Sequence, residues 1–292
     1  MCTGSNEYGQ LGAGPLVGGY SASPVQVTGL AAGASAIAAG AYHACALVNG
    51  GAKCWGDNRS GELGGGNDNA SSVPVEVAGL SAGVSAIEAG ESHACAIVNG
   101  GIQCSGNNKY GQLGDGSTHS SRVPVAVVGL SAGASAVAAG GSQTCAIVNG
   151  GIACWGDNTY GQLGNGDTSR TASLSPINVV GISAGASVTA VGRTHACAIV
   201  DGGARCWGDN GQGQLGNGES SNAANATPIG VLELSSGVSV LSSGFAHTCA
   251  GVRGQVRCWG DNRFAQLGVG PTPDICSTGF PCSVRPRDVR NP

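Results

Sequence analysis

The chain has 292 residues, of which 54 are glycine, 10% are charged and 4% are aromatic, and its formal net charge is −4. A weakly acidic chain offers no broad electropositive face, so we expect no binding of nucleic acid. The first ten residues lack the basic and apolar segments of a secretory leader, and no stretch is apolar enough to predict membrane insertion.

A repeat of 50 to 52 residues runs through the sequence. Its signature, Cys-Trp-Gly-Asp-Asn-x-x-Gly-Gln-Leu-Gly or a close variant, begins at Cys2, Cys54, Cys104, Cys154, Cys206 and Cys258. A polar loop and a short apolar segment around a proline follow, and proline suits an edge strand. Next comes a segment rich in Ala, Gly and Ser, such as 81–90. Glycines at both of its ends leave too few residues for a helix, so we predict a short strand of small residues.

The repeat closes with a hairpin, Cys-Ala-Ile-Val-Asn-Gly-Gly-Ile-Gln-Cys at 95–104. A two-residue turn at Asn99-Gly100 pairs Ile97 with Ile102 and places Cys95 opposite Cys104. This position does not form backbone hydrogen bonds, and its Cα atoms lie about 4.5 Å apart, within disulfide range. Five such pairs predict five disulfides and an oxidising compartment. The alternative is reduced cysteines in a cytosolic core. The predicted pairs are Cys45–Cys54, Cys95–Cys104, Cys145–Cys154, Cys197–Cys206 and Cys249–Cys258.

Cys276 and Cys282 lie in the longer last loop and could form a sixth bridge, which leaves Cys2 alone. Cys2 has the place of the second cysteine of a hairpin, and we expect the first half of that hairpin to lie upstream. Four short strands every fifty residues predict an all-β fold, a β-propeller with five full repeats and one partial repeat. We expect residues 1–292 to form one propeller domain, cut within a repeat at both ends, with six blades or an incomplete ring of seven.

The full pattern is Ala-Gly-x-x-His-x-Cys-Ala-x-Val-x-Gly-Gly-x-x-Cys-Trp-Gly-Asp-Asn-x-x-Gly-Gln-Leu-Gly, and it resembles the regulator of chromosome condensation repeat family. The resemblance covers nearly the whole chain and implies a β-propeller that binds proteins through one face. Relatives include a nucleotide-exchange factor for a small GTPase and a secreted inhibitor of β-lactamases. The cysteines at strand positions look like those of exported bacterial members. The shared motif residues are structural, so no catalytic residue is carried over.

Three sets of repeated side chains could suggest chemistry. Histidines 43, 93, 195 and 247 occupy one repeat position, but ligands on separate blades do not converge on one metal ion, so we expect structural bonds to neighbouring backbone. The Asp-Asn pairs that begin at 57, 157, 209 and 261 lack the calcium-loop spacing and fit turns. The tryptophans at 55, 155, 207 and 259 fit the core. We therefore predict no catalytic residues, no metal site and no cofactor.

The hairpin geometry places two variable segments at one end of each blade, namely the pair before each histidine and the pair after each Asp-Asn. Aromatic residues and arginines are frequent interface anchors, so this end is the predicted binding face. These side chains could instead pack over the blade edge. The candidate binding residues are Tyr42, Glu91, Arg193 and Phe245 before the histidines, and Tyr8, Arg59, Lys109, Tyr110, Tyr160, Arg263 and Phe264 in the second segment.

The sequence thus predicts a non-catalytic binding module that recognises another protein or a cell-surface polymer. We expect a monomer located outside the cell, at the cell surface or in the periplasm. One alternative is a structural spacer within a larger surface protein. The other is a hydrolase or lyase, since propellers host such sites.

Overall fold

The computed structural model describes residues 1–15, 19–272 and 274–289, and within these ranges the chain forms strands and turns and no helix. Accordingly, no helix in the described ranges could cross a membrane. The chain divides into two compact units. The first unit comprises Met1–Thr144 and Leu174–Pro176, and the second comprises Cys145–Ser173 and Ile177–Pro292.

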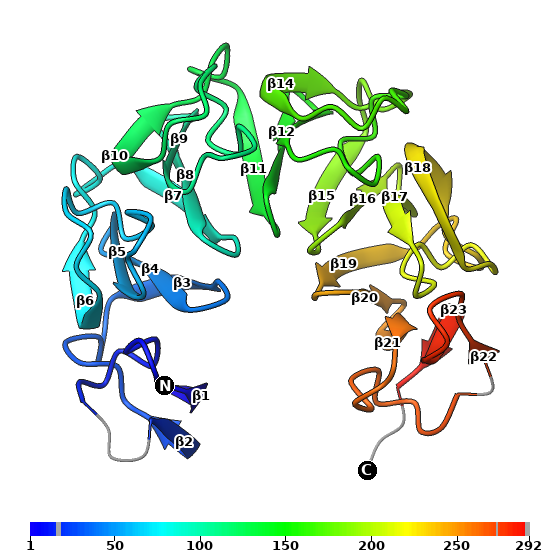
Figure 1. Ribbon diagram of the computed structural model, residues 1–292, viewed down its shortest axis with the longest axis horizontal. Helices are drawn as coiled ribbons and strands as arrows, with labels where there is room; N and C mark the ends of the chain where they lie inside the picture. The colour runs from blue at the N-terminus through cyan, green and yellow to red at the C-terminus, as the bar shows by residue number, and fades with distance from the viewer. Residues whose placement is uncertain (16–18, 273, 290–292) are drawn as a thin grey trace. The chain divides into compact units, whose positions relative to one another are not determined.

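The first unit is built from repeated antiparallel sheets whose strands neighbour one another in chain order (Figure 1). A two-stranded sheet comes first, with β1 (Cys2–Ser5) and β2 (Tyr20–Val25). The next sheet contains β3 (Ala34–Ala39), β4 (His43–Val48), β5 (Gly51–Gly56) and β6 (Ser71–Glu76). It is followed by β7 (Val84–Ala89), β8 (His93–Val98), β9 (Gly101–Gly106) and β10 (Ser121–Ala126), and then by strand β11 (Ala134–Ala139).

The second unit continues the same pattern. The sheet β11-β12-β13-β14 includes β12 (Gln143–Val148), β13 (Gly151–Gly156) and β14 (Ser173–Asn178). The following sheet contains β15 (Ala186–Val191), β16 (His195–Val200), β17 (Gly203–Asn210) and β18 (Ser221–Gly230). The last has the order β19-β20-β21-β23-β22, with β19 (Val238–Ser243), β20 (His247–Val252), β21 (Gln255–Asp261), β22 (Asp274–Ile275) and β23 (Pro281–Asp288).

A two-residue turn sets the register of each hairpin; it is Asn-Gly in three hairpins, Asp201-Gly202 in the fourth and Arg253-Gly254 in the fifth. Asn99 and Gly100 both have positive φ, 51° and 80°, as a type I′ turn requires. Ile97 therefore pairs with Ile102 and Cys95 with Cys104, as the sequence predicts. The five hairpin disulfides are present with Cα–Cα distances of 4.0 to 4.1 Å, Cys276–Cys282 forms a sixth, and Cys2 is free. The predicted disulfide framework is confirmed.

The Ala-rich segments form the first strand of each sheet, so the strand prediction for them is also confirmed. Their small residues allow close approach between successive sheets. A Cβ placed on Gly90 would lie 2.5 Å from the carbonyl oxygen of Gly140 in the next repeat, so only glycine fits there. In the four-stranded sheets the proline-bearing strands lie at the other edge, where the missing N–H group leaves no ladder bond unmade. In the last sheet the short strand β22 lies outside the proline-bearing β23.

The tryptophans lock each sheet onto the preceding one. Trp207 is 0% exposed, and its Nε1 donates a 2.9 Å hydrogen bond to the carbonyl oxygen of Gln162, 45 residues earlier. Trp55 and Trp259 make the same bond to the carbonyl oxygens of Gln10 and Gln214. The core role predicted for these residues is confirmed. The third copy has Ser105 in this place, and a cavity of about 10 Å³, room for one water molecule, lies beside it.

Candidate functional site

Backbone hydrogen bonds bring the two variable segments to the same end of each sheet. The amide of Asp57 donates to the carbonyl oxygen of Tyr42 at 2.9 Å, and the amide of Asp261 donates to that of Ala246 at the same distance. Asn107 and Asp209 make the equivalent bonds to Ser92 and Thr194. We call the end that carries these bonds the loop face, to distinguish it from the Asn-Gly turns at the other end of each hairpin.

Buried asparagines hold the loops of this face in shape. The Oδ1 atom of Asn58 accepts a 2.9 Å bond from the amide of Leu63, while its Nδ2 donates to the carbonyl oxygens of Asn67 and Asn69. Asn108, Asn158, Asn210 and Asn262 accept the equivalent bond from the leucine five residues later. The asparagines thus fix turns, as the sequence predicts, and the variable residues stand on a rigid support.

In the first unit, three predicted residues meet in one cluster. The rings of Tyr8 and Tyr42 lie 5.2 Å apart in an edge-to-face arrangement, and the guanidinium of Arg59 lies 4.8 Å from the centre of the Tyr8 ring. The buried carboxylate of Asp57 binds Arg59 through both Nε and Nη2, at 2.8 and 2.6 Å from Oδ2. The ion pair compensates the charge of Arg59. The cluster presents to solvent the Arg59 side chain, which is 66% exposed, and the Tyr42 ring, which is 45% exposed.

The second unit repeats this construction. Arg193 lies 4.5 Å from the centre of the Phe245 ring. Arg263 lies 5.9 Å from the ring centre of Phe264 and 4.8 Å from that of Phe280, while its guanidinium binds the carboxylate of Asp261. Phe245, Phe264 and Phe280 are 59%, 84% and 45% exposed, so this end of the unit carries a large accessible aromatic surface.

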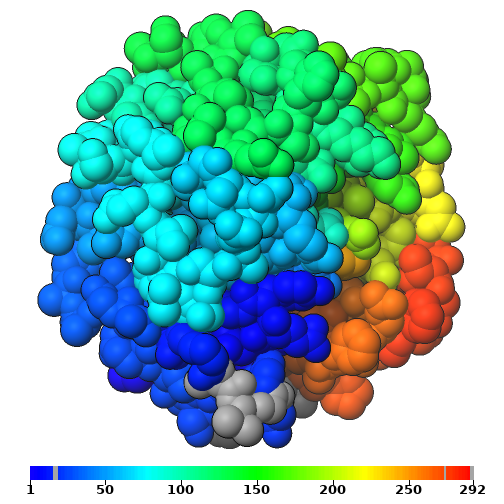
Figure 2. Space-filling view, turned by 60° about the vertical axis from the view of Figure 1, so that its left-hand side comes forward, coloured from blue at the N-terminus to red at the C-terminus, as the bar shows by residue number. Residues whose placement is uncertain are grey.

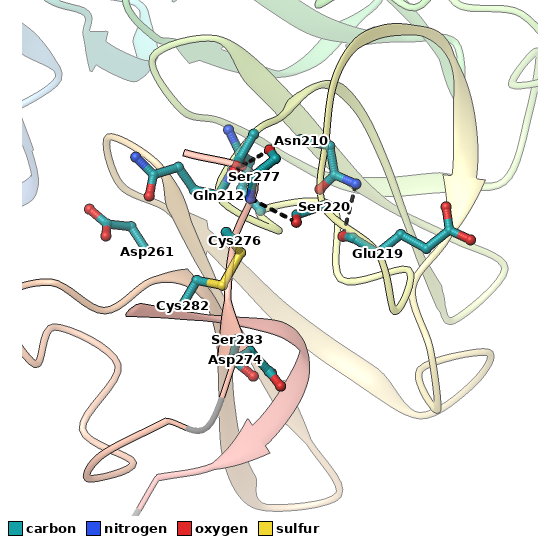
Figure 3. The surroundings of a disulfide bond; sticks show 12 residues. Asn210, Gln212, Glu219, Ser220, Asp261, Asp274, Cys276, Ser277, Cys282 and Ser283 are labelled. Carbon is teal, nitrogen blue, oxygen red and sulfur yellow. Dashed lines mark hydrogen bonds between the residues drawn. A yellow bond between two sulfur atoms is a disulfide. The ribbon is translucent and has the colours of Figure 1, made fainter. Parts of the chain in front are cut away.

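Phe280 is the one member of these clusters that the sequence does not predict. It lies within the loop closed by the Cys276–Cys282 disulfide (Figure 3). The amide of Ser277 donates to Ser220 Oγ at 3.0 Å and its hydroxyl to the carbonyl oxygen of Gly211 at 2.9 Å, which fastens this loop to the neighbouring sheet. The disulfide was visible in the sequence, but the contact of Phe280 with Arg263 depends on how the loop folds back.

The other candidates lie on the same loops without joining these clusters. Lys109 lies 5.3 Å from the ring centre of Tyr110, which is 38% exposed, and Tyr160 is 40% exposed. Glu91 is partly buried, and its amide donates to the carbonyl oxygen of Gly140. The structure therefore groups Tyr8, Tyr42 and Arg59 in one unit, and Arg193, Phe245, Arg263 and Phe264 in the other.

The repeated histidines lie between sheets. His93 Nε2 lies 2.9 Å from Thr144 Oγ1 in the next repeat, and that hydroxyl donates to the carbonyl oxygen of Gln112. His195 and Thr248 form the same pair. The sequence predicts a bond to neighbouring backbone, but the partner of His93 and of His195 is a threonine hydroxyl 51 or 53 positions away. Burial lowers the pKa of His93 and His195 to about 3 and that of His43 to about 4, so these imidazoles are neutral at pH 7.

Within the described residues, no group of three or more His, Cys, Asp or Glu side chains has the geometry to hold a metal ion. The histidines connect one sheet to the next, which is a structural role. The loop face presents aromatic rings and arginine side chains.

Comparison with known proteins accounts for this architecture. The family model for the regulator of chromosome condensation (RCC1) repeat matches residues 2–47, 49–97, 99–147 and 149–199, and a second model of the same repeat matches 34–62 and 84–112. The structure of human WBSCR16 is similar, with a TM-score of 0.81 and 22% identity over 99% of this chain and 76% of that chain.

Two further structures are of yeast proteins. Prp20p from Saccharomyces cerevisiae has a TM-score of 0.69 and 17% identity over 99% of this chain and 85% of that one, and its structure is described together with its binding to Gsp1p and histones. Yeast RCC1 (Prp20) bound to Kap60 has a TM-score of 0.66 and 18% identity, over 99% of this chain and 83% of that chain. These similarities show the fold, a β-propeller of about six blades. Because the matched repeats take up more than half of the sequence, the chain belongs to the regulator of chromosome condensation (RCC1) repeat family.

Proposed function

We propose that this protein is a non-catalytic binding module that recognises another protein through the aromatic and arginine clusters of its loop face. One observation carries the proposal: in each unit, arginines lie over aromatic rings at the end where the sequence varies between repeats, and each cluster exposes at least one ring to solvent. Aromatic residues and arginine are enriched in interface hot spots, where they fill well-packed, desolvated pockets. The sheets that carry these clusters are regular, and a disulfide cross-links the hairpin of each one.

The charge balance of the clusters favours a protein partner over an anionic surface polymer. Arg59 and Arg263 are each bound by a carboxylate that is almost fully buried, which leaves no net positive charge at these two sites. Recognition should therefore depend on contact with the aromatic faces and only weakly on ionic strength. The partner that fits is a protein surface with apolar side chains that pack on Phe245 and Phe264.

The six disulfides support placing this activity in an oxidising compartment, outside the cell, at its surface or in the periplasm. The buried, neutral histidines support a role without catalysis, because groups that titrate near pH 3 or 4 cannot exchange protons efficiently at neutral pH.

The test is affinity capture of extracellular and cell-surface proteins with the wild-type chain and with the double variant Phe245→Ala/Phe264→Ala. Val256→Ala is the matched control, because Val256 is 51% exposed and lies beside the hairpin turn, away from the loop face. We expect the double variant to lose a partner that the wild type and the control retain, at both low and high salt. A partner that all three proteins retain equally would place the binding site elsewhere.

A further inference from the structure

In two sheets, a cation on the second hairpin strand faces a carboxylate on the strand that follows it. In the first unit, whose surface Figure 2 shows in blue to green, Lys53 of β5 is opposite Glu76 of β6, and the two side chains form a 2.9 Å ion pair. In the last sheet of the second unit, Arg257 of β21 is opposite Asp288 of β23, also with a 2.9 Å ion pair. In both sheets the partner strand thus supplies the counter-charge.

Arg205 of β17 has the same place in its sheet but lacks the carboxylate, because its partner in β18 is Gly230 (Figure 1). Arg257 also binds a second carboxylate, that of Glu233, at 3.3 Å. One repeat earlier, Gly181 has the place of Glu233, since each is the third residue of a hydrogen-bonded turn and has positive φ, 71° and 60°. Both carboxylates are therefore replaced by glycine around Arg205. Arg205 is exposed and has no ion-pair partner among the residues that the structure describes.

Packing does not require the glycine at position 230. A Cβ placed on Gly230 would meet no atom within 4 Å, and its φ lies outside the left-handed region. Ala126, Asn178 and Asp288 have this place in other sheets, so the backbone accepts a side chain here. The space that a carboxylate fills in the last sheet is thus open beside Arg205.

A cavity of about 370 Å³ lies at this place in the second unit. Arg205 and Gly230 line it together with Val200, Pro228 and Val231, which are buried or half-buried. A volume of this size is enough for a small ligand. The cavity therefore combines one unpaired guanidinium with an apolar wall.

Asp201, in the hairpin turn, is the acidic residue of the lining. Its amide donates a 3.0 Å hydrogen bond to the carbonyl oxygen of Gly185, and its Oδ1 lies close to the same glycine. This carboxylate is thus held at the turn, against Gly185. The open approach to the guanidinium of Arg205 is at Gly230, where other sheets have a side chain.

We propose that this cavity binds a small carboxylate ligand with an apolar group next to the carboxylate, which takes the place beside Arg205 that Asp288 has beside Arg257. A guanidinium binds a carboxylate through two parallel N–H···O bonds, and the apolar group packs on Val200 and Pro228. Branched-chain acids and the C-terminus of a peptide that ends in an apolar residue share this chemistry. The cavity lies beside the hairpin turn, at the other end of the hairpin from the loop face, so the site is independent of the proposed protein-binding surface.

The test is an NMR titration of the isotope-labelled chain near pH 7 with acetyl-leucine, and acetyl-leucinamide is the matched neutral probe. We expect acetyl-leucine to shift the amide signals of Gly203 and Gly230 saturably, with a dissociation constant on the order of 1 mM. The neutral amide should bind at least about tenfold more weakly. Isovalerate and a peptide that ends in leucine distinguish the two sources: tighter binding of the peptide identifies a chain terminus, and equal or tighter binding of isovalerate identifies a free acid.

Variants followed at the Gly203 signal test the role of each group. Gly230→Asp should abolish binding, because its carboxylate pairs with Arg205 as Asp288 pairs with Arg257, whereas Gly230→Ala should bind as the wild type does. Arg205→Gln should weaken binding at least about tenfold, and Arg257→Gln should leave it unchanged.

The proposal is overturned if acetyl-leucine gives no saturable shift, if the acid and the amide bind equally, or if Gly230→Asp binds like the wild type. Arg205→Gln should still capture a loop-face partner, so this proposal and the proposed function fail separately.

Discussion

Mild acid should destabilise the protein through its buried histidines. His93 and His195 are 0% exposed, and burial lowers their pKa to about 3, against about 6.5 in an unfolded chain. A histidine whose pKa is depressed on folding contributes its full stability above about pH 6.5 and loses it as the pH falls toward the folded value. At about pH 5 each of these two histidines should lower the free energy of unfolding by about 2 kcal/mol.

The variant His93→Gln isolates one of these contributions. Gln143 has the same place in β12 and is also 0% exposed, so the site accommodates a glutamine. Urea denaturation followed by circular dichroism, with the disulfides intact, gives the free energy of unfolding near pH 7.5 and near pH 5. We expect the loss between these two pH values to be about 2 kcal/mol smaller in His93→Gln than in the wild type.

The control is Glu91→Gln, which changes a partly buried residue of the loop before His93 and leaves the imidazole in place. It should show the same histidine-dependent loss as the wild type. If His93→Gln and the wild type lose equal stability on acidification, protonation of His93 does not oppose folding, and the reasoning from burial is wrong.

Three further substitutions test packing and burial by the same denaturation assay. Glu88→Gln should stabilise the protein by about 3 kcal/mol near pH 8 and have no effect near pH 4. Burial raises the pKa of Glu88 to about 7, so the wild type loses stability as the pH rises from 4.5 to 7, and the neutral glutamine avoids that loss. Equal gains at both pH values would refute this. Ala94→Thr should stabilise by about 1 kcal/mol, because both ring nitrogens of His43 are buried without a side-chain hydrogen-bond partner, and the equivalent positions Thr144, in the next repeat, and Thr248, in the last hairpin, supply a hydroxyl to the histidine of the preceding sheet. The isosteric Ala94→Val should not reproduce that gain. Trp207→Phe should lower the free energy of unfolding by about 3 kcal/mol, because it removes the hydrogen bond to the Gln162 carbonyl oxygen and leaves a void. A decrease below about 1 kcal/mol would contradict the role given to the indole.

The hairpins and disulfides could be predicted because a short segment of sequence determines each of them. Cys95 and Cys104 are nine positions apart, and one Asn-Gly turn fixes every pair between them. The histidine partners could not be predicted. His93 and Thr144 lie in two neighbouring sheets, 51 positions apart in the chain, and no local sequence pattern indicates that they meet. Whether residues 1–292 form one domain stays a prediction.

The candidate face could be predicted only in part. The antiparallel course of each hairpin indicates which variable residues share one end of the blade, and Tyr8, Tyr42 and Arg59 do meet at that end. Which arginine lies over which ring depends on loop conformation. Phe280 shows the limit, since its contact with Arg263 requires the disulfide loop to fold back toward the preceding turn.

Hydrogen–deuterium exchange on a complex with a captured partner tests the central claim most directly. The account predicts protection, on binding, in the loop-face segments that contain Phe245 and Phe264, with little change at the two-residue hairpin turns. Protection confined to the turns at Asn99 and Asp201, with the loop-face segments exchanging as in the free protein, would contradict it.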